Sequence, residues 1–282
     1  MVGFLNYREF ATAVDNGQSI TTHFRKAPSQ TTVAGQWFDL SMASGNPVPQ
    51  YYADAPLESS AFNGLRGIWR GTDVSPSRKY LSEVMLCTPT SGFVGQYKLL
   101  DYLLFYPFVD CDITDVQTMT EVATIPRYTD GAGVQVMMVC QAPNTTTGTF
   151  TFDYINQDGA PKTSPAQTVP STIINIASVM SAVPTTTGTG PFLRLASGDT
   201  GVRRIVSVTF SVPAGGLAAL VLVQPIGDFV VREINTPVEK TMLGMRSLGA
   251  RVVDGAYLNF IVRTASTVAG GSLTGRLNFV WN

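Results

Sequence analysis

Short apolar runs separated by turn-forming residues dominate this chain beyond Pro126. A run of this length is typical of a buried or half-buried strand, and repeated runs with turns between them are typical of an antiparallel sandwich. One of them, around Phe150, alternates strictly between aromatic and polar residues, as a strand with one buried face requires. We predict eight strands, at Val134–Gln141, Thr149–Asn156, Ser171–Ala177, Ile205–Val212, Ala218–Gln224, Phe229–Glu233, Ala256–Arg263 and Arg276–Trp281.

The composition supports a globular, β-rich protein without a charged partner. The chain has 32 Thr and 30 Val, whose β-branched side chains fit a pleated sheet, while 26 Gly and 17 Pro supply turns. Hydrophobic residues make up 44% of it, charged residues only 14%, and the net charge is −1. Bulk charge therefore does not favour nucleic acid or an anionic membrane as a partner.

The first 125 residues are predicted to form a loop-rich region, ahead of a C-terminal sandwich over 126–282. Asn6 can cap a short amphipathic helix that ends at Asn16-Gly17, and Arg78–Leu86 is a second short helical candidate. The predicted fold class is thus mostly β, an antiparallel, jelly-roll-like sandwich with one or two short helices.

The most apolar segment runs from Leu99 to Val109 and contains Pro107. It is about half the roughly 20 residues that a membrane-spanning helix needs, so we expect no membrane insertion. A strand buried on both faces is the first interpretation. In the second interpretation, the hydroxyls of Tyr102 and Tyr106 contact a neighbouring subunit, because buried tyrosine hydroxyls need hydrogen-bond partners.

Three aspartates follow this run, and they are the candidate metal ligands of the chain: Asp110, Asp112 and Asp115. With Glu121 they approach the spacing of a calcium loop, but Asp115 stands where that loop needs glycine for its sharp turn. We therefore expect a polar loop without a metal. If the chain were an enzyme, a metal-assisted hydrolase using these aspartates would be the alternative.

No other catalytic set is evident in the sequence. His23 is the only histidine, and neither a G-x-S-x-G elbow nor a P-loop occurs. The cysteines, Cys87, Cys111 and Cys140, form no CxxC pair, so we expect reduced thiols rather than a disulfide framework or a zinc site. No cofactor is expected.

Basic and aromatic residues gather around Trp69, with Arg66, Arg70, Arg78 and Lys79 close by in the sequence. Such a group can stack on single-stranded bases or anchor a protein interface. The low net charge favours the protein interface, for which Trp69, Arg66 and Arg70 are the candidate residues, together with Tyr102 and Tyr106.

Several phrases carry a family resemblance: LLDYLLFYPFVDCDITD, PRYTDGAGVQVMMVCQAP, FDYINQDG, LASGDTGVRRIVSVTFS and DGAYLNFIV with a terminal FVWN. The chain resembles virion structural proteins of tailed bacteriophages that accompany the major coat protein in the head. The resemblance implies a many-copy decoration or cement protein that binds the major capsid protein, self-associates as a dimer or trimer, and assembles in the bacterial cytoplasm. It assigns no functional residue.

Three alternatives remain open. A major coat protein would usually contain a long spine helix, which the sequence does not predict, and a tail or receptor-binding protein is compatible with a β-rich body. A carbohydrate-binding module would use exposed aromatic residues as a sugar platform, with Trp37, Tyr51, Tyr52 and Trp69 as the candidates.

Overall fold

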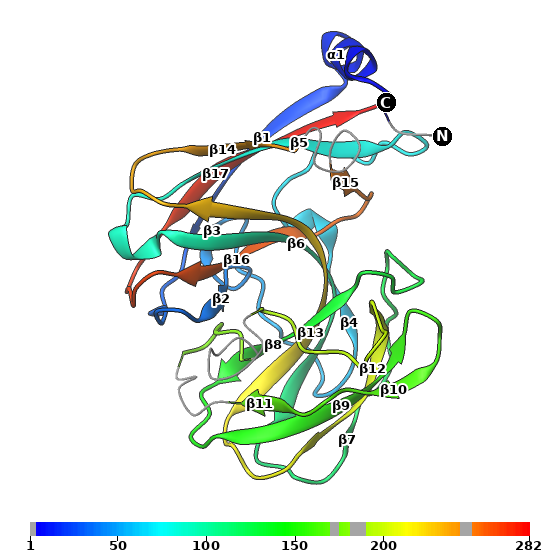
Figure 1. Cartoon of the computed structure of the whole chain (residues 1–282), viewed down its shortest axis with the longest axis vertical. Helices are drawn as coiled ribbons and strands as arrows, with labels where there is room; N and C mark the ends of the chain where they lie inside the picture. The colour runs from blue at the N-terminus through cyan, green and yellow to red at the C-terminus, as the bar shows by residue number, and fades with distance from the viewer. Residues whose placement is uncertain (1–3, 170–174, 181–189, 243–249) are drawn as a thin grey trace.

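A computed structural model describes residues 4–169, 175–180, 190–242 and 250–282 of the chain (Figure 1). The described part is mostly antiparallel β-structure arranged in three sheets, which follow one another along the long axis of the molecule. The predicted fold class is confirmed, although a simple sandwich has two sheets rather than three.

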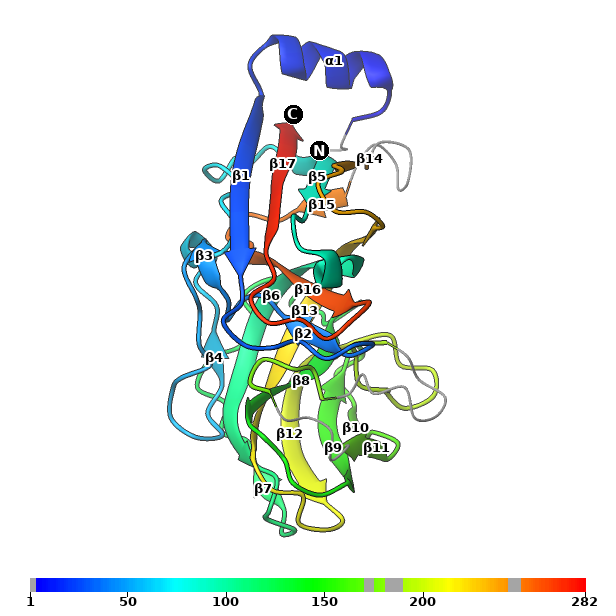
Figure 2. The same cartoon turned by 90° about the vertical axis from the view of Figure 1, so that its left-hand side faces the viewer.

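The upper sheet lies at the end that carries both termini (Figure 2). Its strand order is β14-β5-β17-β1-β3, and β15 pairs with β5. These strands are β1 (Ser19–Ala27), β3 (Ser44–Asn46), β5 (Lys79–Cys87), β14 (Val238–Thr241), β15 (Ala250–Val252) and β17 (Leu273–Trp281).

The central sheet has the order β2-β16-β6-β13-β8, and β4 pairs with β6. The lower sheet has the order β10-β9-β12-β7, and β11 pairs with β9. Their strands are β2 (Trp37–Asp39), β4 (Ser60–Ala61), β6 (Gly95–Asp110), β8 (Gln135–Ala142), β13 (Leu217–Val231) and β16 (Leu258–Thr264) in the central sheet, and β7 (Gln117–Thr118), β9 (Gly148–Asn156), β10 (Pro161–Thr163), β11 (Gln167–Val169) and β12 (Val202–Phe210) in the lower sheet.

The helix α1 (Tyr7–Asp15) forms where the N-terminal signals predict it. The side chain of Asn6 accepts a hydrogen bond from Glu9 N, and Gly17 has a φ of 74°, which suits the end of a helix. Phe10 is buried in a small cluster that also contains Tyr80 of β5, so α1 closes the upper end of the sheet. Two short 3₁₀ helices, η1 (Gly64–Arg66) and η2 (Ser91–Phe93), complete the described helices.

The apolar run is a core strand, as the first interpretation predicts. Leu99 to Val109 lies within β6, and every residue of this stretch is buried except Phe108, which is partly exposed. Tyr97 and Leu99 join the cluster between the upper and central sheets, whereas Leu103 and Tyr106 join the cluster between the central and lower sheets. β6 therefore passes through two cores and connects them.

The predicted elements change in several places, and the nine-residue strand β1 forms within the region predicted to be loop-rich. The helical candidate Arg78–Leu86 is wrong, because this segment forms β5 and pairs with β14, β15 and β17; an isolated helix of that length would be marginal. The two predicted strands around Pro225 are one strand, β13, which continues through a register shift there. The predicted strand at Ser171–Ala177 lies largely outside the described residues.

The division at residue 125 does not coincide with a break between sheets. In each sheet, at least one strand from before this position pairs with a strand from after it: β1 with β17, β6 with β13, and β7 with β12. Whether 1–125 and 126–282 fold as separate units stays a prediction.

Candidate docking surface

The segment from Gly64 to Trp69 presents apolar side chains to solvent beside an exposed arginine. The exposed fraction is 73% for Leu65 and 47% for Trp69, and Arg66 is also exposed. We call Leu65, Arg66 and Trp69 the Trp69 surface. Two of its three residues, Trp69 and Arg66, are those expected from the sequence; Leu65 carries no signal beyond its position inside a 3₁₀ turn.

Glycines allow this segment to lie flat on the chain around Tyr257. A Cβ added to Gly64 would lie 2.1 Å from the carbonyl oxygen of Gly255, and one added to Gly67 would lie 2.8 Å from the nitrogen of Leu258. Ile68 is fully buried and pairs with Leu258 as an isolated bridge. The segment that carries the Trp69 surface therefore packs with its inner side against the backbone of residues 255–258.

Arg70 is not on the surface, contrary to the interface prediction. It is 5% exposed, its Nε donates to the carbonyl oxygen of Ala256 at 3.1 Å, and its Nη1 lies 2.7 Å from Asp73. This guanidinium fastens the segment that follows Trp69 to the loop before β16. Arg70 therefore holds the neighbouring backbone in place and is not available at the surface.

A buried amine and a carboxylate hold the next turn in place. Lys79 Nζ donates to the carbonyl oxygens of Arg70, at 2.7 Å, and Thr72, at 2.6 Å, and burial followed by the charge of Arg70 lowers its pKa. Asp254 accepts from the backbone nitrogens of Val74 and Ser75. The turn is therefore rigid although it is mostly exposed.

A cleft of about 420 Å³ lies beside this turn, lined by residues 75–79 and 251–254. Arg78 and Arg251 line it, and neither makes an ion pair within the described part of the chain. The cleft therefore follows the Trp69 surface along the chain and contains two arginines without an ion pair in the described part.

A buried ion pair, Asp101–Arg127, contacts the chain around Tyr257, on which the Trp69 surface lies. Arg127 donates to Asp101 through Nε at 3.0 Å and through Nη2 at 2.6 Å, and Nη2 also donates to the carbonyl oxygen of Tyr102 at 2.9 Å. The backbone nitrogen of Tyr257 donates to Asp101 as well. Asp101 has no exposed surface, and burial raises its pKa.

A second buried carboxylate, that of Asp39 in β2, accepts hydrogen bonds from three hydroxyl groups. The hydroxyls of Tyr102 and Ser41 each donate to it at 2.6 Å, and the hydroxyl of Tyr52 also donates to it. Lys26 is fully buried nearby and donates to the carbonyl oxygen of Pro47 at 3.0 Å. Burial lowers the pKa of Lys26 to about 8, against the attraction of Asp39. The cluster joins the loop-rich region to β6.

Neither tyrosine expected at an interface reaches the surface. Tyr102 and Tyr106 have no exposed area; Tyr102 donates to Asp39, and Tyr106 Oη accepts from the nitrogen of Ile205 at 3.3 Å. Burial raises the pKa of Tyr106 to about 12. The second interpretation of the apolar run is therefore wrong for the folded chain, because internal partners satisfy both hydroxyls.

The acidic loop is organised by backbone contacts. Asp110 accepts from the nitrogen of Asp112 at 2.9 Å, and Asp112 accepts from the nitrogen of Gly215 at 2.7 Å, while Asp115 is exposed. Within the described ranges, no group of three or more His, Cys, Asp or Glu residues is placed to share a metal ion.

The sugar platform does not form as the carbohydrate-binding alternative requires. Trp37 and Tyr52 are 2% and 1% exposed, because both lie in the cluster under the loop-rich region. Tyr51 and Trp69 are exposed, but the aromatic set is divided between core and surface.

Comparisons with known proteins identify no relative. No family model matches the chain, and no curated protein matches it. Among solved structures, the 2.6 Å structure of infectious bursal virus derived T=1 particles has a TM-score of 0.17 and 11% identity, covering 94% of this chain and 78% of that chain. The infectious bursal disease virus VP2 subviral particle has a TM-score of 0.18 and 8% identity, covering 94% and 80%. At such scores the likeness supports no conclusion about fold or function.

Among the residues described, no helix has the length and apolar character to cross a membrane.

Proposed function

We propose that this chain is a non-enzymatic structural protein of a tailed-phage virion, most specifically a decoration protein that binds the major capsid protein in the head. The resemblance of its sequence to virion structural proteins of tailed bacteriophages is the reason for placing it in a phage head. The observation that carries the proposal is the Trp69 surface, because Trp and Arg are enriched at the centres of protein interfaces and Leu65 adds apolar area beside them.

The rigidity of this surface favours binding. Arg70, the buried pair Asp101–Arg127 and the close backbone contact at Gly64 fix its position before any partner arrives. A preformed surface loses little conformational entropy on association, so more of the contact energy remains as affinity. Many copies binding one lattice would add to this through multivalency.

The helical content favours decoration over the coat alternative. Within the described ranges the longest helix is α1, with nine residues, whereas a spine helix would be several times longer. A tail or receptor-binding position is distinguished by where the chain is found in the particle rather than by its fold.

The test uses heads assembled without this chain, from a phage whose genome carries its coding sequence. The purified chain should co-sediment with them, and Trp69→Ala should weaken binding about 30-fold, the effect of losing about 2 kcal/mol at a hot spot. Leu65→Glu should abolish binding, because it buries an unpaired charge in the contact. Tyr51→Ala is the matched control, since it truncates another exposed aromatic residue.

Failure of the unmodified chain to bind such heads would overturn the decoration proposal. Recovery of the chain in purified tails would support the tail alternative instead. Equal losses for Trp69→Ala and Tyr51→Ala would show that the Trp69 surface is not the contact.

A further inference from the structure

One edge of the upper sheet is open along most of a nine-residue strand. β1 pairs with β17 over Ser19–Lys26, but on its other side β3 pairs only with Arg25, Lys26 and Ala27. Figure 2 shows β1 at the border of this sheet, with β3 beside its lower end and α1 extending over the opposite side. Among the described residues, no strand therefore pairs with residues 19–24 on their outer side.

Two contacts establish which backbone groups point outward. The nitrogen of Trp281 donates to the carbonyl oxygen of Gln18, so even-numbered residues of β1 face β17. On the other side of β1, Gly45 of β3 lies against the carbonyl oxygen of Arg25, since a Cβ added to Gly45 would be only 2.0 Å from that oxygen. The backbone groups of odd-numbered residues therefore point away from β17, toward the open side. The N–H and C=O groups of Ser19, Thr21 and His23 consequently point away from the sheet.

The other sheet edges in the described part are short, covered or interrupted. β8 and β2 are capped by the segment around Val179, through hydrogen bonds such as Met180 N to Met138 O and Val179 N to Trp37 O. β3, β7, β10, β11, β14 and β15 have four residues or fewer.

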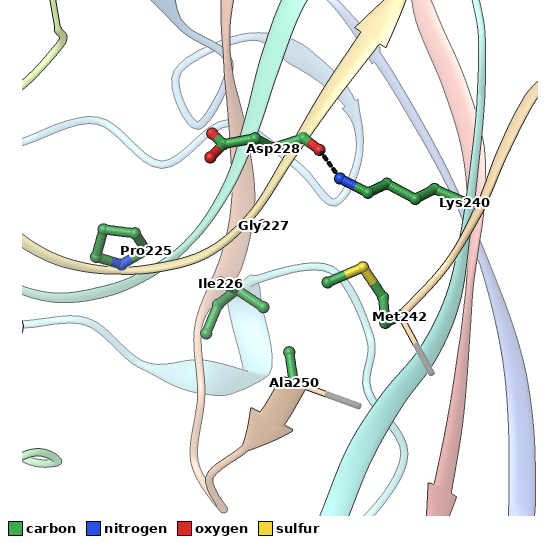
Figure 3. A pocket seen from close by; sticks show the side chains of 7 residues that line it. All are labelled: Pro225, Ile226, Gly227, Asp228, Lys240, Met242 and Ala250. Atoms are coloured by element: carbon green, nitrogen blue, oxygen red, sulfur yellow. Dashed lines mark hydrogen bonds between the residues drawn. The ribbon is translucent and has the colours of Figure 1, made fainter. Parts of the chain in front are cut away.

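The upper part of β13 has an outer edge too, and it is protected. It contains Pro225 and a register shift, and Lys240 Nζ donates to the carbonyl oxygen of Asp228 at 2.7 Å (Figure 3). Proteins protect strand edges by such devices: proline, bulges, lysine, short strands or covering segments. Residues 19–24 have none of them, and their pairing with β17 is free of register shifts.

We propose that this edge pairs with the same edge of a second copy of the chain. A row of unpaired N–H and C=O groups is matched by another extended backbone, and antiparallel pairing of identical strands around a two-fold axis uses the same residues on both sides.

The symmetric register centred on Thr21 fits the sequence. It places Thr21 opposite Thr21 of the partner subunit and Ser19 opposite the partner's His23, and no two like charges face each other between residues 17 and 25. Threonine pairs of this kind are favourable across antiparallel strands. The side chains of Ser19, Thr21 and His23 are exposed and lie on one face, so they would not clash with the core.

The inference deepens the self-association expected of the proposed function and rests on that function for its biological setting. The two can fail separately. A chain that dimerises through β1 but does not bind heads would contradict the decoration proposal alone.

The experiment measures molar mass by light scattering and the dimer Kd by sedimentation. The unmodified chain should be a dimer. Thr21→Lys and Thr21→Glu should each weaken the dimer about tenfold or more, because like charges face each other at the axis, and their equimolar mixture should restore it. Thr168→Lys, at an exposed threonine of β11 in the lower sheet, is the matched control and should remain dimeric.

Thr21→Pro tests the backbone itself, since it removes the outward N–H at a position where an edge strand tolerates proline. It should be monomeric with an unchanged circular dichroism spectrum. A monomeric unmodified chain, or a dimer that neither Thr21→Pro nor the charged variants weaken, would overturn the inference.

Discussion

The buried pair Asp101–Arg127 gives the most demanding test of the fold. Replacing Arg127 with methionine keeps an apolar stem in place but removes all three hydrogen bonds of the guanidinium, two to the carboxylate and one to the carbonyl oxygen of Tyr102. Asp101 would retain only the hydrogen bond from Tyr257 N, with no access to solvent.

Removing one partner of such a buried pair costs about 3–5 kcal/mol, because the remaining charge is uncompensated. This is a large fraction of the roughly 5–15 kcal/mol by which folded domains are stable. Burial also raises the pKa of Asp101, and without Arg127 the protonated carboxyl is favoured further. The unfolded chain then binds fewer protons than the folded variant above pH 4, so the destabilisation should grow from pH 5 to pH 8.

Urea unfolding followed by tryptophan fluorescence measures this loss as a change in the free energy of unfolding. Arg276→Met is the matched control, because Arg276 pairs with Glu83 and Glu239 at 35% side-chain exposure and should cost at most about 1 kcal/mol. The double variant Asp101→Leu with Arg127→Met should recover much of the loss. If Arg127→Met and Arg276→Met destabilised the protein equally, the buried pair would not support the fold as argued.

Three further predictions follow from buried groups and close contacts. Because burial lowers the pKa of Lys26 to about 8, its unfolded form binds more protons between about pH 8 and pH 10.5; the free energy of unfolding should rise over this window in the unmodified chain and rise less in Lys26→Met. Burial raises the pKa of Cys111 and Cys140 to about 12, so a thiol reagent at pH 8 should label the partly exposed Cys87 first and these two only on unfolding, as mass spectrometry of labelled peptides would show. Gly64→Ala should cost about 1–3 kcal/mol in urea unfolding, because its Cβ would meet the carbonyl oxygen of Gly255.

Local patterns in the sequence were sufficient for α1 and for seven of the nine described strands that have seven or more residues, but not for β1, β5 or the short strands. The alternation around Phe150 and the apolar run of β6 determine which faces are buried, since a strand places successive side chains on opposite sides. The same logic fails for β5, because Leu81 and Val84 are compatible with a helix until the neighbouring strands are known. Pairing partners far apart in the sequence decide that segment.

The candidate site was only partly predictable for the same reason. Trp69 and Arg66 are exposed as expected, but Arg70 donates to a carbonyl oxygen 186 residues further along the chain. No local pattern distinguishes an arginine that contacts a partner from one that ties two loops together. Tyr102 likewise depends on Asp39, 63 residues before it, for the hydrogen bond that makes its burial acceptable.

The placement of charge connects the fold to the proposed function. Charged residues make up only 14% of the chain, and six of them lie buried in clusters that hold loops onto the upper and central sheets: Lys26, Asp39, Arg70, Lys79, Asp101 and Arg127. These six charges are therefore not available at the surface. The two proposed contacts use apolar side chains such as Trp69 and backbone groups such as those of β1, and salt screens contacts of this kind little. Both proposed contacts should therefore depend little on ionic strength.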